Sequence, residues 1–334
     1  MPEVSFVWLE ITGKCQLKCA HCYADSGPAG TQGSMTAADW ERVIDQAAGL
    51  GVSMVQFIGG EPTMHPDLPE LIDHALAAGV EVEVFSNLVH VPTSLWDTFG
   101  RPGVRLACSY YSDDPVQHAA VTGRTSSHAR TRANIVEALR RSISLRVGVI
   151  DLGDGQPVDA AITELEALGV ADVGFDRLRQ VGRGVREQQP SMEQLCGHCA
   201  SDVLAVAPDG TVWPCVFSRW LPVGNVLTSS LADILASTPL AEARHQLTTH
   251  SAAEAADPAG KGEPGVESNC NPHCNPCQPR CEPGCHPQCN PACQPNCSPG
   301  CSPTCNPTTC SPRACWPPFS EVGNRWSLLG EQVV

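Results

Sequence analysis

Short apolar runs alternate with amphipathic stretches over the first half of the chain. Runs rich in β-branched residues predict buried strands, and apolar positions that recur with the helical period predict helices between them. We expect six strands, at Phe6–Ile11, Met54–Ile58, Val80–Phe85, Val104–Ser109, Leu145–Ile150 and Val170–Phe175. We expect five helices, near Ala37–Leu50, Leu68–Ala78, Thr93–Phe99, Arg130–Arg141 and Val158–Leu168.

Helix ends carry the capping residues that this pattern needs. Gly51, Gly79 and Gly169 follow three of the expected helices, and Thr36 with Asp39 resembles an N-terminal capping box. Strands alternating with helices predict an α/β fold with a parallel sheet, whose chemistry lies at the carboxyl ends of the strands. The pattern alone leaves a barrel and a doubly wound open sheet both possible.

Periodicity is lost toward the C-terminus. We expect an α/β core over residues 1–180, a smaller region with its own cysteines over residues 181–250, and a low-complexity tail rich in Pro, Gly and Cys over residues 251–334. The tail is expected to be disordered or irregular.

Charge and cysteine content narrow the class of protein. The net charge of −15 argues against a nucleic-acid partner. No apolar window is long enough for a membrane span, and the N-terminus has no secretion signal, so we expect a cytoplasmic protein. Seven of the nineteen cysteines precede residue 216 and twelve lie between Cys270 and Cys315. In a reducing compartment such clusters indicate metal or redox chemistry rather than disulfides.

The first cysteine cluster follows the first expected strand. Cys15, Cys19 and Cys22 form a C-x3-C-x2-C pattern. Three thiolates in one loop can bind three irons of a cubane cluster and leave the fourth iron open. A structural zinc site with His21 as the fourth ligand is the alternative.

The loop Cys15–Cys22, followed by Tyr23, resembles the cluster motif of the radical S-adenosylmethionine (SAM) superfamily, and Gly59–Pro62 after the second strand resembles its GGEP motif. The resemblance implies a partial (β/α)6 TIM-type barrel and a 4Fe-4S cluster on the three cysteines, with SAM bound to the fourth iron. It also implies reductive cleavage of SAM to a 5′-deoxyadenosyl radical, hydrogen abstraction from a substrate, and an external electron donor such as flavodoxin or ferredoxin. Catalytic residues beyond the cluster stay unknown.

Seven residues are candidates for contact with SAM. Two glycines let a strand end approach a ligand closely, a carboxylate can accept hydrogen bonds from an ammonium group, and a proline fixes the following turn. Three further residues match less specific positions of the family, near the adenine, ribose and carboxylate of SAM. Each of them can equally be interpreted as a cap or turn residue. The candidates are Gly59, Gly60, Glu61, Pro62, Tyr23, Asn87 and Ser109.

A second cluster lies beyond the core. Asp209-Gly210, between two apolar runs, predicts a hairpin that folds Cys215 back toward Cys196 and Cys199. The spacing resembles the opening of SPASM or twitch regions, which implies an auxiliary iron–sulfur cluster. A zinc ribbon completed by His198 or a tail cysteine is the alternative. The later SPASM spacing is not found in register, so one auxiliary cluster is expected and a second stays open. Cys108, alone at a strand end, is expected in the core.

The tail repeats roughly Cys-x-Pro-x. A proline in each repeat forbids a helix, and in polyproline II geometry four residues advance about 12 Å, too far for neighbouring thiolates to share a metal without turns. Disorder, metal or cluster binding, and a sulfur-donating or redox role all remain open.

Two substrate classes fit these expectations. Auxiliary clusters are familiar in enzymes that crosslink or epimerise ribosomally made peptides, so a precursor peptide is favoured slightly. The core begins within the first residues, which leaves no room for a fused leader-binding domain, so a separate recognition protein is expected. The alternative is dehydrogenation or epimerisation of a sugar, nucleoside or aminocyclitol. A non-catalytic metal-binding protein is the third hypothesis.

Overall fold

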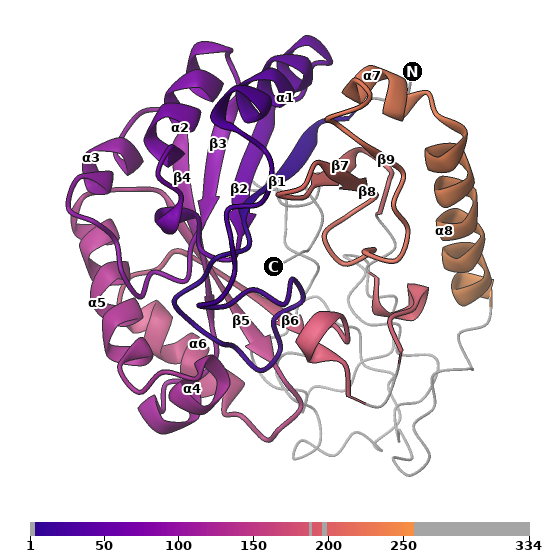
Figure 1. The fold of residues 1–334 in the computed structure, drawn as a ribbon. Coiled ribbons are helices and arrows are strands. Elements are labelled where there is room, and N and C mark those ends of the chain that lie inside the picture. The colour runs from indigo at the N-terminus through magenta and orange to yellow at the C-terminus, as the bar shows by residue number, and fades with distance from the viewer. Residues whose placement is uncertain (1–3, 187–188, 196–198, 257–334) are drawn as a thin grey trace, which may run out of the picture. The chain divides into compact units, whose positions relative to one another are not determined.

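Six parallel strands stand side by side in chain order and form a curved sheet (Figure 1). The computed structural model describes residues 4–186, 189–195 and 199–256. The first five strands consist largely of buried residues, as expected where helices cover one face and side chains fill the other. The strands are β1 (Phe6–Thr12), β2 (Met54–Gly59), β3 (Glu81–Phe85), β4 (Val104–Tyr110), β5 (Leu145–Asp151) and β6 (Asp172–Arg177).

The strand order identifies the sheet as an open barrel. β1 pairs with β2, and each later strand pairs in parallel with the one before it. Right-handed crossovers in one direction put every helix on the outer face, whereas a doubly wound sheet reverses its order. The expected partial barrel is therefore confirmed. The outer helices are α1 (Ala37–Gly49), α2 (Leu68–Ala77), α3 (Leu95–Phe99), α4 (Pro115–Thr122), α5 (Ser127–Arg140) and α6 (Val158–Ala167).

Local signals account for most element ends. Thr36 and Asp39 form the expected capping box at α1, and Gly51, Gly79 and Gly169 have positive φ after α1, α2 and α6. β6 begins and ends two residues later than expected.

Helix α4 was not predicted, although its signals are in the sequence. Asp114 accepts hydrogen bonds from the backbone of Val116 and Gln117, Pro115 occupies the first turn, and Gly123 closes the helix in the left-handed conformation. An N-cap, an early proline and a terminal glycine are the usual marks of a helix. The apolar periodicity of α4 is weak, which explains the miss.

The barrel interior has a charged lower layer and an upper layer that lines a pocket. Glu83 on β3 is fully buried and accepts two hydrogen bonds from Arg146, at 2.6 and 2.8 Å. Arg105 forms a second ion pair with Glu83 at 2.8 Å. Nearer the carboxyl ends of the strands, the lining side chains include Ile58, Phe85, Ser109 and Ile150.

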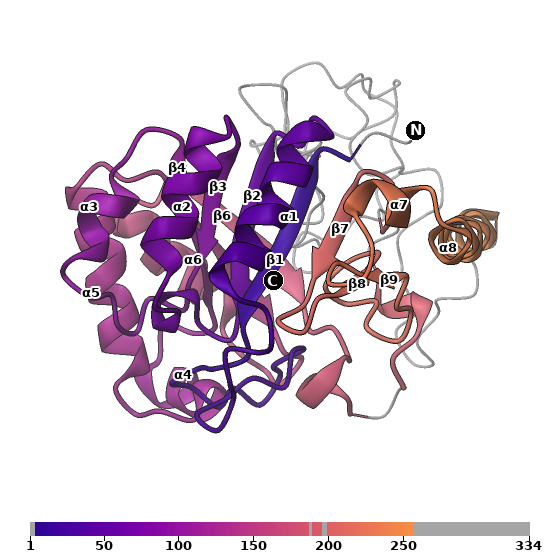
Figure 2. The same cartoon turned by 45° about the horizontal axis from the view of Figure 1, so that its top comes forward.

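A second region extends the sheet on the other side of β1. β7 (Val203–Val206) pairs in parallel with β1, and β8 (Thr211–Trp213) turns back antiparallel to β7, which confirms the expected hairpin. Figure 2 shows β7 beside β1. The pairing of β7 with β1 was not foreseen. The other elements are the 3-10 turns η1 (Pro62–Met64), η2 (Gly182–Gly184) and η3 (Met192–Gln194), with β9 (Gly224–Asn225), α7 (Leu231–Leu235) and α8 (Thr238–Ala256).

Helix α8 was not predicted, and it continues past residue 251, where the tail was expected to begin. Residues 257–334, with all twelve tail cysteines, lie outside the described residues. Within the described part of the chain, no helix has the length and apolar character that a membrane crossing requires.

Candidate active site

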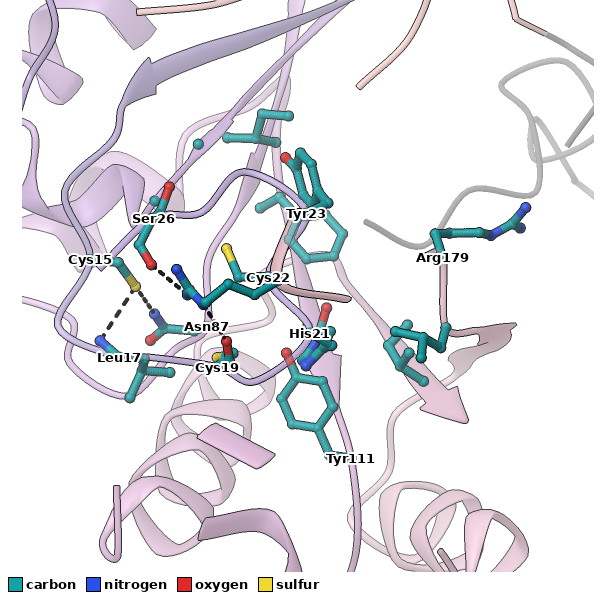
Figure 3. Close-up of a pocket in the computed structure, with 18 of the residues that line it drawn as sticks. Cys15, Leu17, Cys19, His21, Cys22, Tyr23, Ser26, Asn87, Tyr111 and Arg179 are labelled. Carbon is teal, nitrogen blue, oxygen red and sulfur yellow. Dashed lines mark hydrogen bonds between the residues drawn. The ribbon is translucent and has the colours of Figure 1, made fainter. Parts of the chain in front are cut away.

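A pocket opens at the carboxyl ends of the barrel strands (Figure 3). Three cysteines from the loop after β1 line it together with residues from the ends of β2, β3, β4 and β5. The turn after β6 and Phe217, which follows β8, complete the wall. The candidates that line the pocket are Cys15, Cys19, Cys22, Tyr23, Gly59, Gly60, Asn87 and Ser109.

Cys15 is held by its neighbours within the pocket. Its sulfur accepts hydrogen bonds from the backbone nitrogen of Leu17 at 3.4 Å and from the side-chain amide of Asn87 at 3.6 Å. Burial, with the nearby charge of Glu61, raises the pKa of the Cys15 thiol to about 12. A positively charged metal centre would favour the thiolate, because metal binding releases the thiol proton.

Cys19 and Cys22 lie in the part of the loop that rests on α4. The backbone nitrogens of Lys18 and Ala20 donate to the carbonyls of Thr122 and Val121, at 3.2 and 2.9 Å. Burial raises the pKa of Cys19, and the charges of the neighbouring cysteines add to this effect. The loop is therefore anchored by backbone hydrogen bonds that do not depend on its thiols.

The donor set fits an iron–sulfur cluster. Among the described residues, no three His, Cys, Asp or Glu side chains converge on one metal ion. A cubane presents separate irons to separate thiolates, so three cysteines spread around one pocket suit it.

Gly59 and Gly60 serve the packing of two strand ends. A Cβ on Gly59, whose φ is +126°, would overlap the carbonyl of Thr12, and one on Gly60 would overlap the carbonyl of Lys14. Both glycines also line the pocket. Their first physical role is thus to bring the end of β2 against the cysteine loop, and the expected close approach to a ligand remains a prediction.

Glu61 and Pro62 are not among the pocket-lining residues. Glu61 is fully buried, and its carboxylate accepts hydrogen bonds from the backbone and hydroxyl of Thr63, the hydroxyl of Ser86 and the backbone of Asn87, at 2.8 to 3.1 Å. Burial raises its pKa, although these donors oppose the shift. The structure therefore gives Glu61 the role of joining the ends of β2 and β3. The expected contact with an ammonium group stays a prediction.

Tyr23, which follows the cysteine loop, and Ser109, which lies in β4, both line the pocket. The ring of Tyr23 packs edge-on against Phe217, with 5.3 Å between the ring centres. Ser109 lies near the end of β4 and is nearly buried. Their expected contacts with SAM stay predictions.

Sequence reasoning missed several polar and charged residues that line the pocket. His21, considered only as a zinc ligand, lines the pocket and packs edge-on against Tyr111 at 4.8 Å. Burial lowers the pKa of His21 to about 4, with the charges of Arg183 and Arg186 adding to the effect. Three arginines at the end of β6 and in the turn after it were not given a site role, although the Gly182-Arg183-Gly184 motif was visible. The missed polar and charged residues are His21, Ser26, Tyr111, Arg177, Arg179 and Arg183.

The second cysteine cluster is brought together as expected, as far as it is described. The sulfur atoms of Cys199 and Cys215 lie 3.0 Å apart, and both cysteines are buried. The β7–β8 hairpin causes this approach, because Cys215 follows β8 directly. Cys196 and His198 lie outside the described residues. Cys108 is buried in the core.

Two family models match the chain. The model of the radical SAM superfamily matches residues 9–167, which span the barrel strands β1 to β5 and the cysteine loop. The SPASM model, an iron–sulfur cluster-binding domain, matches residues 196–278. The second match runs 28 residues past 250, into the segment that the sequence pattern assigns to the tail. The two matches favour iron–sulfur clusters over zinc at both cysteine groups.

Curated relatives include several PqqA peptide cyclases. The one from Xanthomonas campestris pv. campestris is 28% identical over 211 residues, covering 62% of this chain and 55% of the relative. The one from Streptomyces rochei is 27% identical over 278 residues, covering 68% of this chain and 74% of the relative. The chain thus spans about half the length of the Xanthomonas relative.

Solved structures share the fold at low sequence identity. SuiB from Streptococcus suis, bound to the precursor peptide SuiA, has a TM-score of 0.61 and 13% identity, covering 72% of this chain and 66% of SuiB. The structure of anSMEcpe with bound AdoMet and a peptide has a TM-score of 0.59 and 12% identity, covering 72% of this chain and 82% of anSMEcpe. The structural similarity to both proteins covers 72% of this chain, so it extends beyond the barrel.

Proposed function

The chain belongs to the radical SAM superfamily and carries a SPASM iron–sulfur region, and we propose that it matures a ribosomally synthesised precursor peptide by crosslinking or epimerisation. The observation that carries the proposal is the pocket, where three cysteines of one loop face the carboxyl ends of the barrel strands. The peptide substrate is supported by relatives that are named peptide cyclases.

Each part of the site has a proposed role. Cys15, Cys19 and Cys22 hold the catalytic cluster, and Cys199 with Cys215 takes part in an auxiliary cluster to which Cys196 also contributes. Tyr23, Asn87 and Ser109 contact SAM, with Gly59 and Gly60 close by and Glu61 and Pro62 supporting the strand end behind them. With the cluster and SAM bound, the chemistry available here is reductive cleavage of SAM and hydrogen abstraction from the substrate.

The protein's own residues shield and orient the substrate. Ile58, Phe85, Ile150 and Phe217 give the pocket an apolar wall that excludes water from a reactive intermediate. Arg177 is exposed and lines the same pocket, where it can bind a carboxylate of the substrate. A flavodoxin or ferredoxin supplies electrons.

The first test is turnover by the full-length protein, purified and reconstituted without oxygen. We expect about eight irons per chain, matching two clusters, and about four in the Cys15→Ala/Cys19→Ala/Cys22→Ala variant. Only the intact protein should form 5′-deoxyadenosine from SAM with dithionite. Zinc in place of iron, with no cleavage of SAM, would contradict the proposal.

The peptide substrate is tested separately, with the short peptides encoded beside the gene as probes. A loss of two hydrogens from one of them, or uptake of deuterium from heavy water, would identify a crosslink or an epimerisation by mass spectrometry. Cleavage of SAM with no mass change in these peptides, together with turnover of an added sugar or nucleoside, would contradict a peptide substrate.

A further inference from the structure

The turn after β6 contacts the cysteine loop at three backbone carbonyls. Nε of Arg183 donates to the carbonyl of Cys19 at 2.9 Å, and Nη2 donates to the carbonyl of Ser26 at 2.6 Å. The backbone nitrogen of Arg183 donates to the carbonyl of Cys22 at 3.0 Å. One residue therefore holds the Cys19–Ser26 segment at both ends and near its middle.

The neighbouring glycines allow this contact. A Cβ on Gly182, whose φ is +58°, would lie 2.6 Å from the carbonyl oxygen of Cys22 and would overlap that of Tyr23. A Cβ on Gly184 would lie 2.6 Å from the carbonyl oxygen of Arg179. The turn thus packs backbone against backbone on the cysteine loop, which only glycine permits at these positions.

The guanidinium of Arg183 also brings a positive charge to the cysteines. Its two side-chain hydrogen bonds go to neutral carbonyls. Its carboxylate neighbour, Asp25, is 3.8 Å away and 67% exposed, so solvent screens that pair. A positive charge that stays beside the loop favours the more negative, reduced form of a cluster, because net charge and hydrogen bonding set cluster potentials.

We propose that Arg183 is a positioning residue of the catalytic cluster: its fork of donors fixes the Cys19–Ser26 segment, and its charge raises the reduction potential of the cluster. The turn that carries Arg183 follows β6 and precedes the SPASM region, so the same residue ties the cluster loop to the far end of the barrel. The proposal rests on the cluster of the proposed function and is independent of the peptide substrate.

The test compares Arg183→Met and Arg183→Lys in the full-length protein, reconstituted without oxygen. Iron release to a chelator and the reduction potential, from a titration followed by electron paramagnetic resonance, are measured for each. In Arg183→Met we expect a more negative potential and iron release about tenfold faster, equivalent to a loss of about 1.4 kcal/mol. Arg183→Lys keeps the charge and loses the planar fork, so the potential should stay near that of the wild type while iron release still accelerates.

Arg186→Met and Arg186→Lys are the matched controls. Arg186 is an exposed arginine three residues further along, and its guanidinium pairs with Asp154 at 2.7 and 2.9 Å. Both controls should behave like the wild type. If the Arg183 variants match the Arg186 variants in potential and in iron release, the proposal is wrong. If the wild type takes up no iron, the proposed function itself is wrong. That result differs from failure of the Arg183 proposal, in which the wild type binds iron normally.

Discussion

Glu83 shows how a single buried charge is balanced inside the barrel. Burial opposes ionisation of this carboxyl, but Arg146 and Arg105 outweigh it and hold the pKa of Glu83 at about 2. The pair with Arg146 is bidentate, the strongest geometry for arginine and carboxylate. The ring of Phe85, which lines the pocket, packs against the same guanidinium, with 5.5 Å between Cζ of Arg146 and the ring centre. The charged layer therefore supports the floor of the pocket.

Glu83→Gln should destabilise the protein by about 3–5 kcal/mol, because the buried Arg146 and the half-buried Arg105 lose their counter-charge. Chemical denaturation at neutral pH measures the change in unfolding free energy. Glu137→Gln is the control, since this partly exposed carboxylate pairs with Arg140 and Arg141 at the surface. The folded-state pKa of Glu83 is lowered, so its contribution is present above about pH 4.3 and is lost as the pH falls toward about 2. Equal losses in the two variants would contradict this account.

The cysteine loop is an element whose shape depends on its neighbours. The end of β2, the end of α4 and the turn η2 all contact its backbone. Gly60 matters most at the β2 side, where its nitrogen donates to the carbonyl of Thr12 and its α-carbon lies against Lys14.

Gly60→Ala should displace the cysteine loop and reduce the iron retained after reconstitution, because the new methyl group overlaps the Lys14 carbonyl. Gly49→Ala is the matched control: Gly49 lies in α1, its added methyl meets nothing within 4 Å, and alanine should stabilise the helix by about 0.5–1 kcal/mol. Iron per chain and melting temperature are measured for both. Full iron retention in Gly60→Ala would show that the loop tolerates the shift.

At the scale of the whole molecule, the barrel and the SPASM region share one sheet and one buried ion pair. β7 pairs with β1 along Phe6–Leu9. Arg219 reaches from beyond β8 to Glu10 on β1 at 2.7 Å, and its guanidinium lies 4.3 Å from the centre of the Trp213 ring. Burial raises the pKa of Glu10, and Arg219 opposes that shift. Arg219 therefore favours the ionised form of a carboxylate whose burial favours the protonated form.

Arg219→Met should lower the free energy of unfolding by roughly 3 kcal/mol or more at neutral pH, because Glu10 stays buried without its cation. The folded-state pKa of Glu10 then rises further, so the folded protein binds more protons than the unfolded chain above about pH 4.3 and stability falls as the pH increases. Melting temperatures at about pH 5 and pH 8 give the measurement.

The double variant Glu10→Gln/Arg219→Met provides the control. It removes the titrating carboxyl, so the extra fall in melting temperature with pH that is expected for Arg219→Met should disappear. Parallel melting profiles for the wild type and Arg219→Met across this range would show that Glu10 carries no charge in the folded protein.

Much of the site followed from short stretches of sequence. The cysteine loop and the strand-end glycines were identified because their spacing within a few residues has chemical meaning. Asn87 was expected near SAM, and the structure adds its contact with Cys15, 72 positions away. Glu61 was expected to face a ligand, but its carboxylate accepts four hydrogen bonds from Thr63, Ser86 and Asn87. Thr63 is a neighbour in sequence, whereas only the fold brings Ser86 and Asn87 to Glu61.

The sequence by itself determined the alternation of strands and helices, the capping of α1 and the two cysteine groups, because each depends on residues a few positions apart. Only the tertiary structure decided that β7 joins β1, that Arg183 holds the carbonyl of Cys19 across 164 positions and that Arg219 pairs with Glu10 across 209. Such contacts depend on how the whole chain closes around its core. The local patterns of period and charge are compatible with many partners, and the packing of the sheet selects one.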